Sequence, residues 1–336
     1  MRHKKTQVEN YFAGNNLKKT KNCKIIGSLD FGGLSNYWGL QIDNYINLNN
    51  QKLKKKTKKD INSSFLELLR NYKLLGTFKS KDTTYSNDYL IPAHLEEFKK
   101  QKNKKFNLQK PILAFNKLLK KKNLNNLNED KDKLNSYNFL KMSRLSKKIR
   151  FHNFYLDEMT SLGKKIKLTC KNKNKYKVFI ANKVILATGT IATTKLVMGF
   201  LNIKREVKIN HHPRLIAVYL GKKNIKFNLN FTPSLLQFIG KGKDNYFCAD
   251  FRPGNKLITE SMVELSKLLY PLKFLINFFK NRLIFTNILL SPKYSDIYIK
   301  NLNKSFLIYT KKNNLLNKFK KANFKIFSFL NKKKII

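Results

Sequence analysis

The segment "KVILATGTIATTKLVM", residues 183–198, decides the predicted fold, because it reads as a strand followed at once by a helix. Its apolar run Val184–Ala187 is continuous and does not alternate with polar residues, which is typical of a strand buried on both faces of a sheet. Thr188 and Gly189 occupy the turn, where the N–H groups of a helix N-terminus favour an anion. The alternative is an ordinary strand-to-helix crossover, which any α/β protein contains.

A second unusual segment, "FGGLSNYWG", spans residues 31–39. The chain has 13 glycines and one tryptophan, yet three of the glycines and the tryptophan lie in this short stretch. Glycine allows positive φ and close approach to a ligand, and short polar and flat aromatic side chains suit a planar cofactor that carries phosphate. A tight turn beside a core tryptophan explains the pattern equally well. The residues predicted to contact a cofactor here are Gly32, Gly33, Ser35, Asn36, Trp38 and Gly39.

Several further elements are predicted around these two segments. The capped, apolar-striped segment 60–76 predicts a helix that ends at Gly76. A second, longer helix is expected at about 258–280. The Lys- and Asn-rich stretch from about 99 to 135 predicts a surface insertion or long loop. Residues from 166 to 180 predict a hairpin, and later strands are expected at 214–221, 246–251, 296–300 and 305–310.

The composition limits the function classes. Lysine and arginine number 70 against 20 acidic residues, a formal net charge of +50. Only eight of the basic residues are arginines, and the lysines are spread along the whole chain. Base readout favours arginine, so we expect AT-rich codon drift to explain the charge and predict no specific nucleic-acid partner. Dedicated nucleic-acid binding is the alternative.

No secretory signal or apolar run long enough to span a bilayer is recognisable. The segment 268–290 comes nearest, but Lys273, Lys280 and Arg282 interrupt it, so we expect a core or interfacial helix and membrane contact that is peripheral at most. Three widely spaced cysteines predict no metal site and no disulfide framework. A reducing, cytoplasmic location follows as the expectation.

Together and in this order, the two segments resemble the glucose–methanol–choline family of flavin oxidoreductases, in the branch found in bacterial surface-polysaccharide gene clusters. "GGLSNYWG" is similar to the family's Gly-Gly-x-Ser-x-x-Trp-Gly loop, and "VILATGTIATTKLVM" to its second flavin-contacting segment. "LLSPKYSDIYIK", residues 289–300, is similar to a segment that opens a substrate-domain strand. The resemblance covers roughly residues 27–310, although only about thirty positions carry it.

The resemblance implies a mixed fold, α/β plus α+β, in which a partial FAD-binding, Rossmann-like domain joins an antiparallel-sheet substrate domain. The first would comprise residues 1–60 and 160–210, and the second residues 211–330, with a helical and loop insertion at 61–159. Gly32, Gly33, Ser35 and Trp38 would line the flavin, and Thr188 and Gly189 would lie near its ADP portion. The implied reaction is oxidation of an alcohol, such as a sugar, by FAD.

Two departures from the family are clear. The Gly-x-Gly-x-x-Gly unit that holds the FAD pyrophosphate is absent before residue 31, and no histidine follows His212, so no catalytic base can be named. We therefore expect the middle portion of a truncated or split enzyme, with a separate chain as one source of the missing half. The alternatives are an inactive remnant and a basic protein that binds nucleic acid or a membrane surface.

The adjacent His211 and His212, in "INHHPRL", have no third ligand at a suitable spacing for a metal. We expect them to have a structural role in a loop. The alternative, a place at the edge of the substrate site, follows from the resemblance, since the family has a His-Pro loop before a substrate-domain strand.

Overall fold

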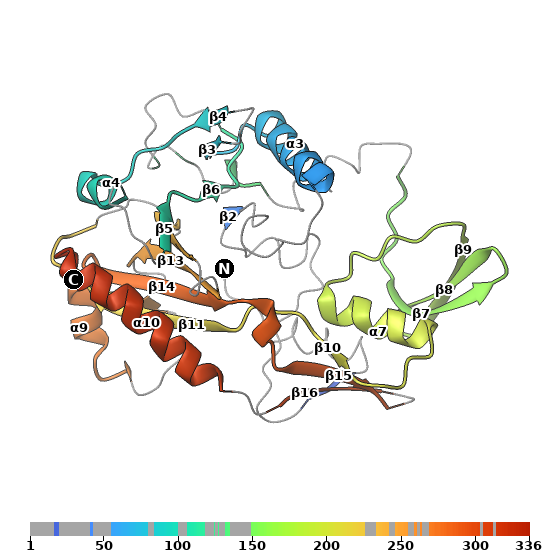
Figure 1. Ribbon diagram of the computed structural model, residues 1–336. Coiled ribbons are helices and arrows are strands. Elements are labelled where there is room, and N and C mark those ends of the chain that lie inside the picture. The colour runs from blue at the N-terminus through green and yellow to red at the C-terminus, as the bar shows by residue number, and fades with distance from the viewer. Residues whose placement is uncertain are drawn as a thin grey trace. The chain divides into compact units, whose positions relative to one another are not determined.

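The computed structural model of the chain is a mixed α/β protein whose sheets are mostly antiparallel (Figure 1). It divides into two compact units, residues 1–37, 135–212 and 292–314, and residues 38–134, 213–291 and 315–336. The structure describes residues 17–19, 41–42, 55–79, 84–99, 106–117, 124, 127, 132–134, 149–225, 233–241, 246–254, 259–260, 263, 269–302, 305–311 and 314–336.

The first unit contains a four-stranded sheet with the order β1-β16-β15-β10. The strands β1 and β16 are parallel, and the other pairs are antiparallel. A cluster of buried apolar side chains packs this sheet against α7, namely Met198, Ile209, Ile299, Phe306 and Ile308. The elements are β1 (Leu17–Lys19), α7 (Thr190–Phe200), β10 (Val207–Lys208), β15 (Ile297–Asn301) and β16 (Phe306–Thr310).

A three-stranded antiparallel meander, β7 (Tyr155–Leu162), β8 (Lys165–Asn172) and β9 (Lys175–Ala181), belongs to the same unit. It confirms the hairpin predicted over 166–180 and adds β7 to it. The turn between β8 and β9 places Lys173 at φ 52°, within the left-handed region that tight hairpin turns require. The helix α7 then begins at Thr190, as predicted.

The predicted buried strand at Val184–Ala187 is wrong. These residues belong to no strand, and Ile185 is 94% exposed. An apolar run becomes a doubly buried strand only where neighbouring strands pair with it and helices cover it, and no described residue does so here. A Rossmann-like parallel sheet is therefore not confirmed among the described residues.

The second unit is built on a five-stranded antiparallel sheet with the order β11-β14-β13-β12-β5. It agrees with the antiparallel sheet expected in this half of the chain, and β11 and β13 match predicted strands. The strand β5, from the stretch predicted as a surface loop, pairs with β12. The elements are β5 (Phe106–Gln109), β11 (Arg214–Leu220), β12 (Leu236–Gly240), β13 (Phe247–Pro253) and β14 (Leu283–Leu290).

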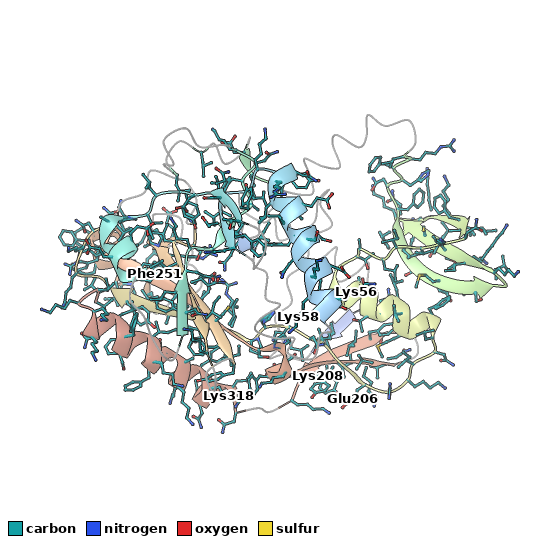
Figure 2. All side chains as sticks on the ribbon, turned by 45° about the horizontal axis from the view of Figure 1, so that its top comes forward. Lys56, Lys58, Glu206, Lys208, Phe251 and Lys318 are labelled. Atoms are coloured by element: carbon teal, nitrogen blue, oxygen red, sulfur yellow. The ribbon has the colours of Figure 1, made fainter. Side chains whose placement is uncertain are left out.

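The C-terminal helix α10 (Leu315–Lys332) covers one face of this sheet (Figure 1). Its buried residues recur at helical spacing and form one apolar stripe. The ring centroids of Phe238 and Phe329 are 6.5 Å apart, and the Tyr219 hydroxyl is hydrogen-bonded to Asn323 Oδ1 at 2.5 Å. Phe251 of β13 is fully buried on this same face of the sheet (Figure 2). The stripe comprises Phe319, Ala322, Ile326, Phe329 and Leu330.

The helix α3 (Lys55–Asn71) begins and ends earlier than the prediction of 60–76. The residue with positive φ after the helix is Lys73, at φ 48°, while Leu74 N–H donates to Leu69 C=O at 3.1 Å, which is a Schellman ending. The expected terminator Gly76 instead opens β3 (Gly76–Lys79), which pairs with β4 (Thr84–Asn87). Gly76, which follows the apolar stripe of the helix, therefore begins the next strand and does not end the helix.

Two other predictions are corrected in the second unit. The stretch 99–135 includes the strands β5 and β6 (Ile112–Leu113), with Ala114 and Phe115 fully buried, so it is not a surface loop throughout. Of the helix predicted at about 258–280, residues 259, 260 and 263 are helical, and the short helix α9 (Lys273–Phe278) follows. The described residues 269–272 are not α-helical, so one continuous helix is not observed, and β14 begins at Leu283. Among the described residues, no helix is both long and apolar enough to cross a membrane.

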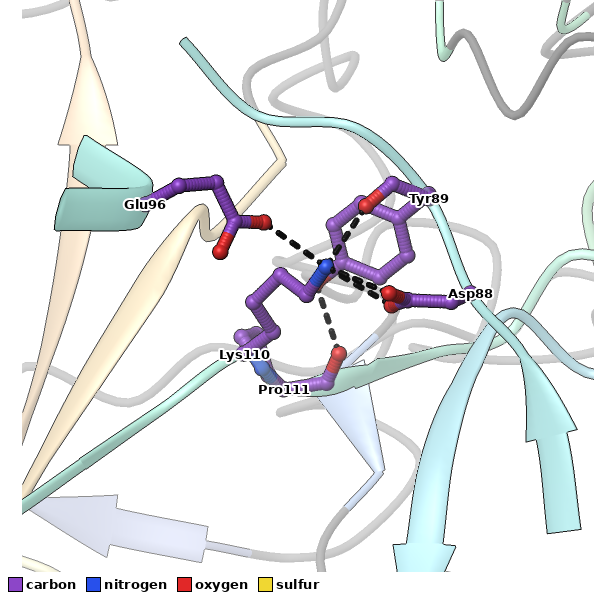
Figure 3. A network of polar contacts seen from close by, with 5 residues as sticks. All are labelled: Asp88, Tyr89, Glu96, Lys110 and Pro111. Atoms are coloured by element: carbon purple, nitrogen blue, oxygen red, sulfur yellow. Dashed lines mark hydrogen bonds and ion pairs between the residues drawn. The ribbon is translucent and has the colours of Figure 1, made fainter. Parts of the chain in front are cut away.

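A buried lysine links the chain around β5 and β6 to the helix α4 (Ala93–Lys99), as Figure 3 shows. Lys110 Nζ lies 2.8 Å from Asp88 Oδ2, 2.9 Å from Glu96 Oε1 and 2.8 Å from the Tyr89 carbonyl. The Tyr89 hydroxyl donates to the Pro111 carbonyl at 2.7 Å. Three acceptors thus satisfy the three N–H donors of one ammonium group, which offsets the cost of burying its charge.

Candidate functional site

Two of the predicted cofactor residues lie in the described part of the chain, Thr188 and Gly189, directly before α7. Gly189 adopts φ 81° and ψ 160°, a conformation that glycine alone adopts readily. A Cβ placed there would meet nothing within 4 Å, and no side chain caps the helix. The Thr188 and Thr193 hydroxyl oxygens are 3.0 Å apart. An open helix N-terminus behind a glycine fits an anion such as the pyrophosphate of FAD.

The other predicted contacts lie outside the described residues: Gly32, Gly33, Ser35, Asn36, Trp38 and Gly39. That these residues and Gly189 form one flavin site therefore stays a prediction. The described half also departs from expectation, because no strand leads into Thr188.

A polar contact joins two segments that the sequence analysis treated separately, "INHHPRL" and "SPKYSDIYIK". His211 Nδ1 lies 2.5 Å from the Ser295 hydroxyl oxygen, and that hydroxyl donates to the Ile209 carbonyl. The carbonyl can only accept, so the hydroxyl proton points to it and Ser295 must accept from His211 Nδ1–H. The Nε2 lone pair of His211 is then left as an acceptor. Asp296 Oδ1 lies 3.9 Å from Nε2.

Burial lowers the pKa of His211, against the opposing effect of the Asp296 carboxylate. His211 is consequently neutral near pH 7, with its tautomer set by Ser295. The prediction of a structural loop role fits the bond to Ser295. No sequence pattern pairs the two residues, because 84 positions separate them.

A row of polar side chains crosses one face of the five-stranded sheet, opposite the face that α10 covers. Cross-strand partners in register place four of them side by side: Asn287 of β14, Asp250 of β13, Gln237 of β12 and Gln109 of β5. Gln109 Nε2 donates to Gln237 Oε1 at 2.8 Å. We call these four residues, with Arg214 and Arg252, the polar row.

The two arginines extend the polar row. Arg214 Nε donates to Asn287 Oδ1 at 2.8 Å, and Arg252 donates to Asp250 Oδ2 at 3.0 Å. Burial lowers the pKa of Arg214, and the neighbouring Arg252 charge acts in the same direction, while Asp250 opposes both. Two guanidinium groups thus share one carboxylate, so the polar row carries a net positive charge.

Burial of two polar side chains, those of Asp250 and Gln237, reduces the stability of the folded chain. The side chain of Asp250 is 7% exposed, and its Oδ1 atom has no hydrogen-bond partner among the described residues. Gln237 is fully buried. A buried carboxylate oxygen that lacks a partner costs about 1–3 kcal/mol, and such costs are typical of functional sites. The sequence alone could have pointed to Asp250 and Asn287, because both are polar residues within largely apolar strands. That they lie side by side follows only from the pairing of β13 with β14.

No protein-family model matches the chain, and no curated protein matches it in sequence. The resemblance to the glucose–methanol–choline family therefore stays a prediction from the two segments.

Proposed function

We propose that the protein is an FAD-dependent oxidoreductase that acts on a CH–OH group of a sugar or polysaccharide precursor. FAD, when bound, supplies the acceptor for the hydride. The observation that carries the proposal is the polar row, because its carboxylate, amide and guanidinium groups match the donors and acceptors of a polyhydroxylated substrate. The Nη groups of the exposed Arg214, which Asn287 orients, would donate to substrate oxygens.

The helix α7 supports the cofactor part of the proposal. Its N-terminal N–H groups and Gly189 would hold a phosphate of FAD, because the helix dipole favours negative charge there. The open space at Gly189 leaves room for the phosphate oxygens to approach the backbone. Thr188 would border the same position with its hydroxyl group.

The visible spectrum of the purified full chain, titrated with FAD and then exposed to a panel of sugars, tests the proposal. Retained flavin that is bleached by a sugar supports it. Gly189→Val should weaken flavin retention, whereas Gly163→Val should not. Gly163 is the matched control, since it also has positive φ, 60°, and open space at its Cβ position, but lies in the β7–β8 turn.

Two other outcomes would each replace the proposal. Flavin that is bound but never reduced by any sugar would indicate an inactive remnant. Absence of flavin, alone and with the products of flanking reading frames, would favour a basic binding protein. The labelled lysines Lys56 and Lys58 of α3, Lys208 of β10 and Lys318 of α10 belong to different elements (Figure 2). This spread suits weak, salt-sensitive binding to any polyanion.

A further inference from the structure

The first unit contains a cavity of about 420 Å³, bordered by α7, β7 and the strands β15 and β16. Its lining combines aromatic side chains with side-chain amides and charged groups. Asn202 is held at φ 49° where α7 ends, and Ile203 N–H closes that turn by donating to Met198 C=O at 2.8 Å. The lining residues used below are Asp157, Lys195, Phe200, Asn202, Asn301 and Phe306.

Lys195 is the unusual residue of this cavity. It lies on the buried side of α7 beside Leu196, and its side chain is only 7% exposed. The nearest carboxylate oxygen, Asp157 Oδ1, is 4.0 Å from Nζ, which is beyond hydrogen-bond distance. Lysine is almost never buried without a close partner. Lys110 illustrates the contrast, since three acceptors lie within 2.9 Å of its ammonium group.

Burial also lowers the pKa of Lys195, and the distant Asp157 only partly opposes this effect. A larger fraction of the side chain is then a neutral amine at pH 7 than for an exposed lysine. A neutral amine in a cavity is a nucleophile toward carbonyl carbon.

We propose that this cavity binds a small, uncharged carbonyl compound with hydroxyl groups, and that Lys195 holds the compound as an imine. Phe200 and Phe306 would contact its carbon skeleton, and the amides of Asn202 and Asn301 would bond its hydroxyl groups. The carboxylates of Asp157 and the neighbouring Glu158 border the cavity and repel anions, so the ligand is not an acid, and the ammonium form of Lys195 disfavours a cation. This inference does not rest on the flavin reaction.

The chemistry balances without another reactant. Nζ attacks the carbonyl carbon, a C–N bond forms, and the carbonyl oxygen takes up a proton. The resulting carbinolamine loses its hydroxyl group with a second proton as water, and a protonated imine remains. Asp157, 4.0 Å from Nζ, lies where it would receive the proton that nitrogen loses and return it to the departing hydroxyl group. Addition of water reverses the sequence.

Reductive trapping tests the proposal. The full chain is incubated at pH 7 with glyceraldehyde and sodium cyanoborohydride, and modification of each lysine is followed by peptide mass spectrometry. Lys195 should react faster than the exposed Lys164 and Lys167 by about tenfold or more, because the cavity would hold the aldehyde beside its amine. Propionaldehyde, of similar size without hydroxyl groups, should give a smaller preference for Lys195.

A matched variant completes the design. Lys195→Arg keeps the positive charge but forms no imine of this kind, so labelling at the remaining lysines should be unchanged. A rate at Lys195 equal to or below that of Lys167 would overturn the proposal and leave a structural lysine that orients α7. Equal preference for the two aldehydes would overturn the assigned ligand class.

Discussion

His211 and Ser295 are 84 residues apart in the chain, yet His211 Nδ1 lies 2.5 Å from the Ser295 hydroxyl oxygen. The hydroxyl donates a hydrogen bond to the Ile209 carbonyl, so the histidine must be the donor to Ser295. The loop before β11 is thereby tied to the loop before β15 through one neutral imidazole.

This arrangement predicts a pH dependence of stability. The pKa of His211 is lowered in the folded state by burial, with Lys208 and His212 acting in the same direction and Asp296 against it. The unfolded chain therefore binds the proton more tightly, and the free energy of unfolding should fall as the pH falls below the ordinary histidine value of about 6.5. Urea denaturation between pH 5 and 8 measures this effect.

His211→Asn supplies the control for that measurement. Its amide nitrogen can replace Nδ1 as the donor to Ser295 but does not titrate, so the variant should lose part of the pH dependence and keep most of its stability at pH 8. His212→Gln, at the exposed neighbouring position, removes only a smaller contribution to the lowered pKa of His211 and should keep most of the pH dependence. Identical pH profiles for the parent and His211→Asn would contradict the prediction.

Lys110→Met should destabilise the second unit by about 2–4 kcal/mol, because it removes the cation that Asp88 and Glu96 share. The Lys110 side chain is 7% exposed, so water does not readily replace it. Lys117→Met is the comparison, since Lys117 pairs with Asp132 and its side chain is 36% exposed. Chemical denaturation should give it a smaller loss, and equal losses would argue against a special role for the Lys110 network.

The surroundings of Gly254 and Gly199 predict opposite effects of a change to alanine on stability. A Cβ at Gly254 would lie 2.3 Å from the Lys280 carbonyl oxygen, so Gly254→Ala should cost about 2 kcal/mol or more. A Cβ at Gly199 would meet nothing within 4 Å, and the residue is helical, so Gly199→Ala should stabilise by about 0.5 kcal/mol. Thermal melts of both variants check the signs. A stabilising effect at Gly254 would show that the close approach to Lys280 is relieved at little cost.

The sequence predicts local structure where one segment is sufficient to specify it. The β8–β9 hairpin, α7 and the strands β11, β13, β15 and β16 all follow from turn residues and apolar runs. Val184–Ala187 was misassigned because burial on both faces depends on neighbours that the run itself does not encode. The helix α10 was missed, although its stripe of Phe319, Ala322 and Ile326 has helical spacing, because lysine and asparagine dominate the segment around it.

The candidate sites depend still more on the tertiary structure. Asp250 and Asn287 become neighbours through the register of β13 and β14, which no single-strand pattern specifies. Lys195 looks like a surface residue within "TIATTKLVMGF", a segment whose apolar residues lie on more than one side of the helix. Only the packing of α7 against β7 shows that its side chain is buried.

The charge of the polar row provides the last prediction. Two guanidinium groups, those of Arg214 and Arg252, share the single carboxylate of Asp250. Asp250→Asn removes the carboxylate charge that pairs with Arg252 and should cost about 2 kcal/mol or more at pH 7. Asn287→Asp places a second carboxylate where Asn287 Oδ1 already accepts from Arg214 at 2.8 Å, and it should stabilise by up to about 1 kcal/mol.

The two isosteric exchanges change the charge in opposite directions within one row, so differences in side-chain volume do not confuse the comparison. Chemical denaturation at pH 7 and again near pH 3 separates charge from shape, because the gain in Asn287→Asp should vanish once the new carboxyl group is protonated. If both variants lose the same stability at pH 7, geometry and not net charge dominates the row, and its complementarity to substrate oxygens would then depend on the amides alone.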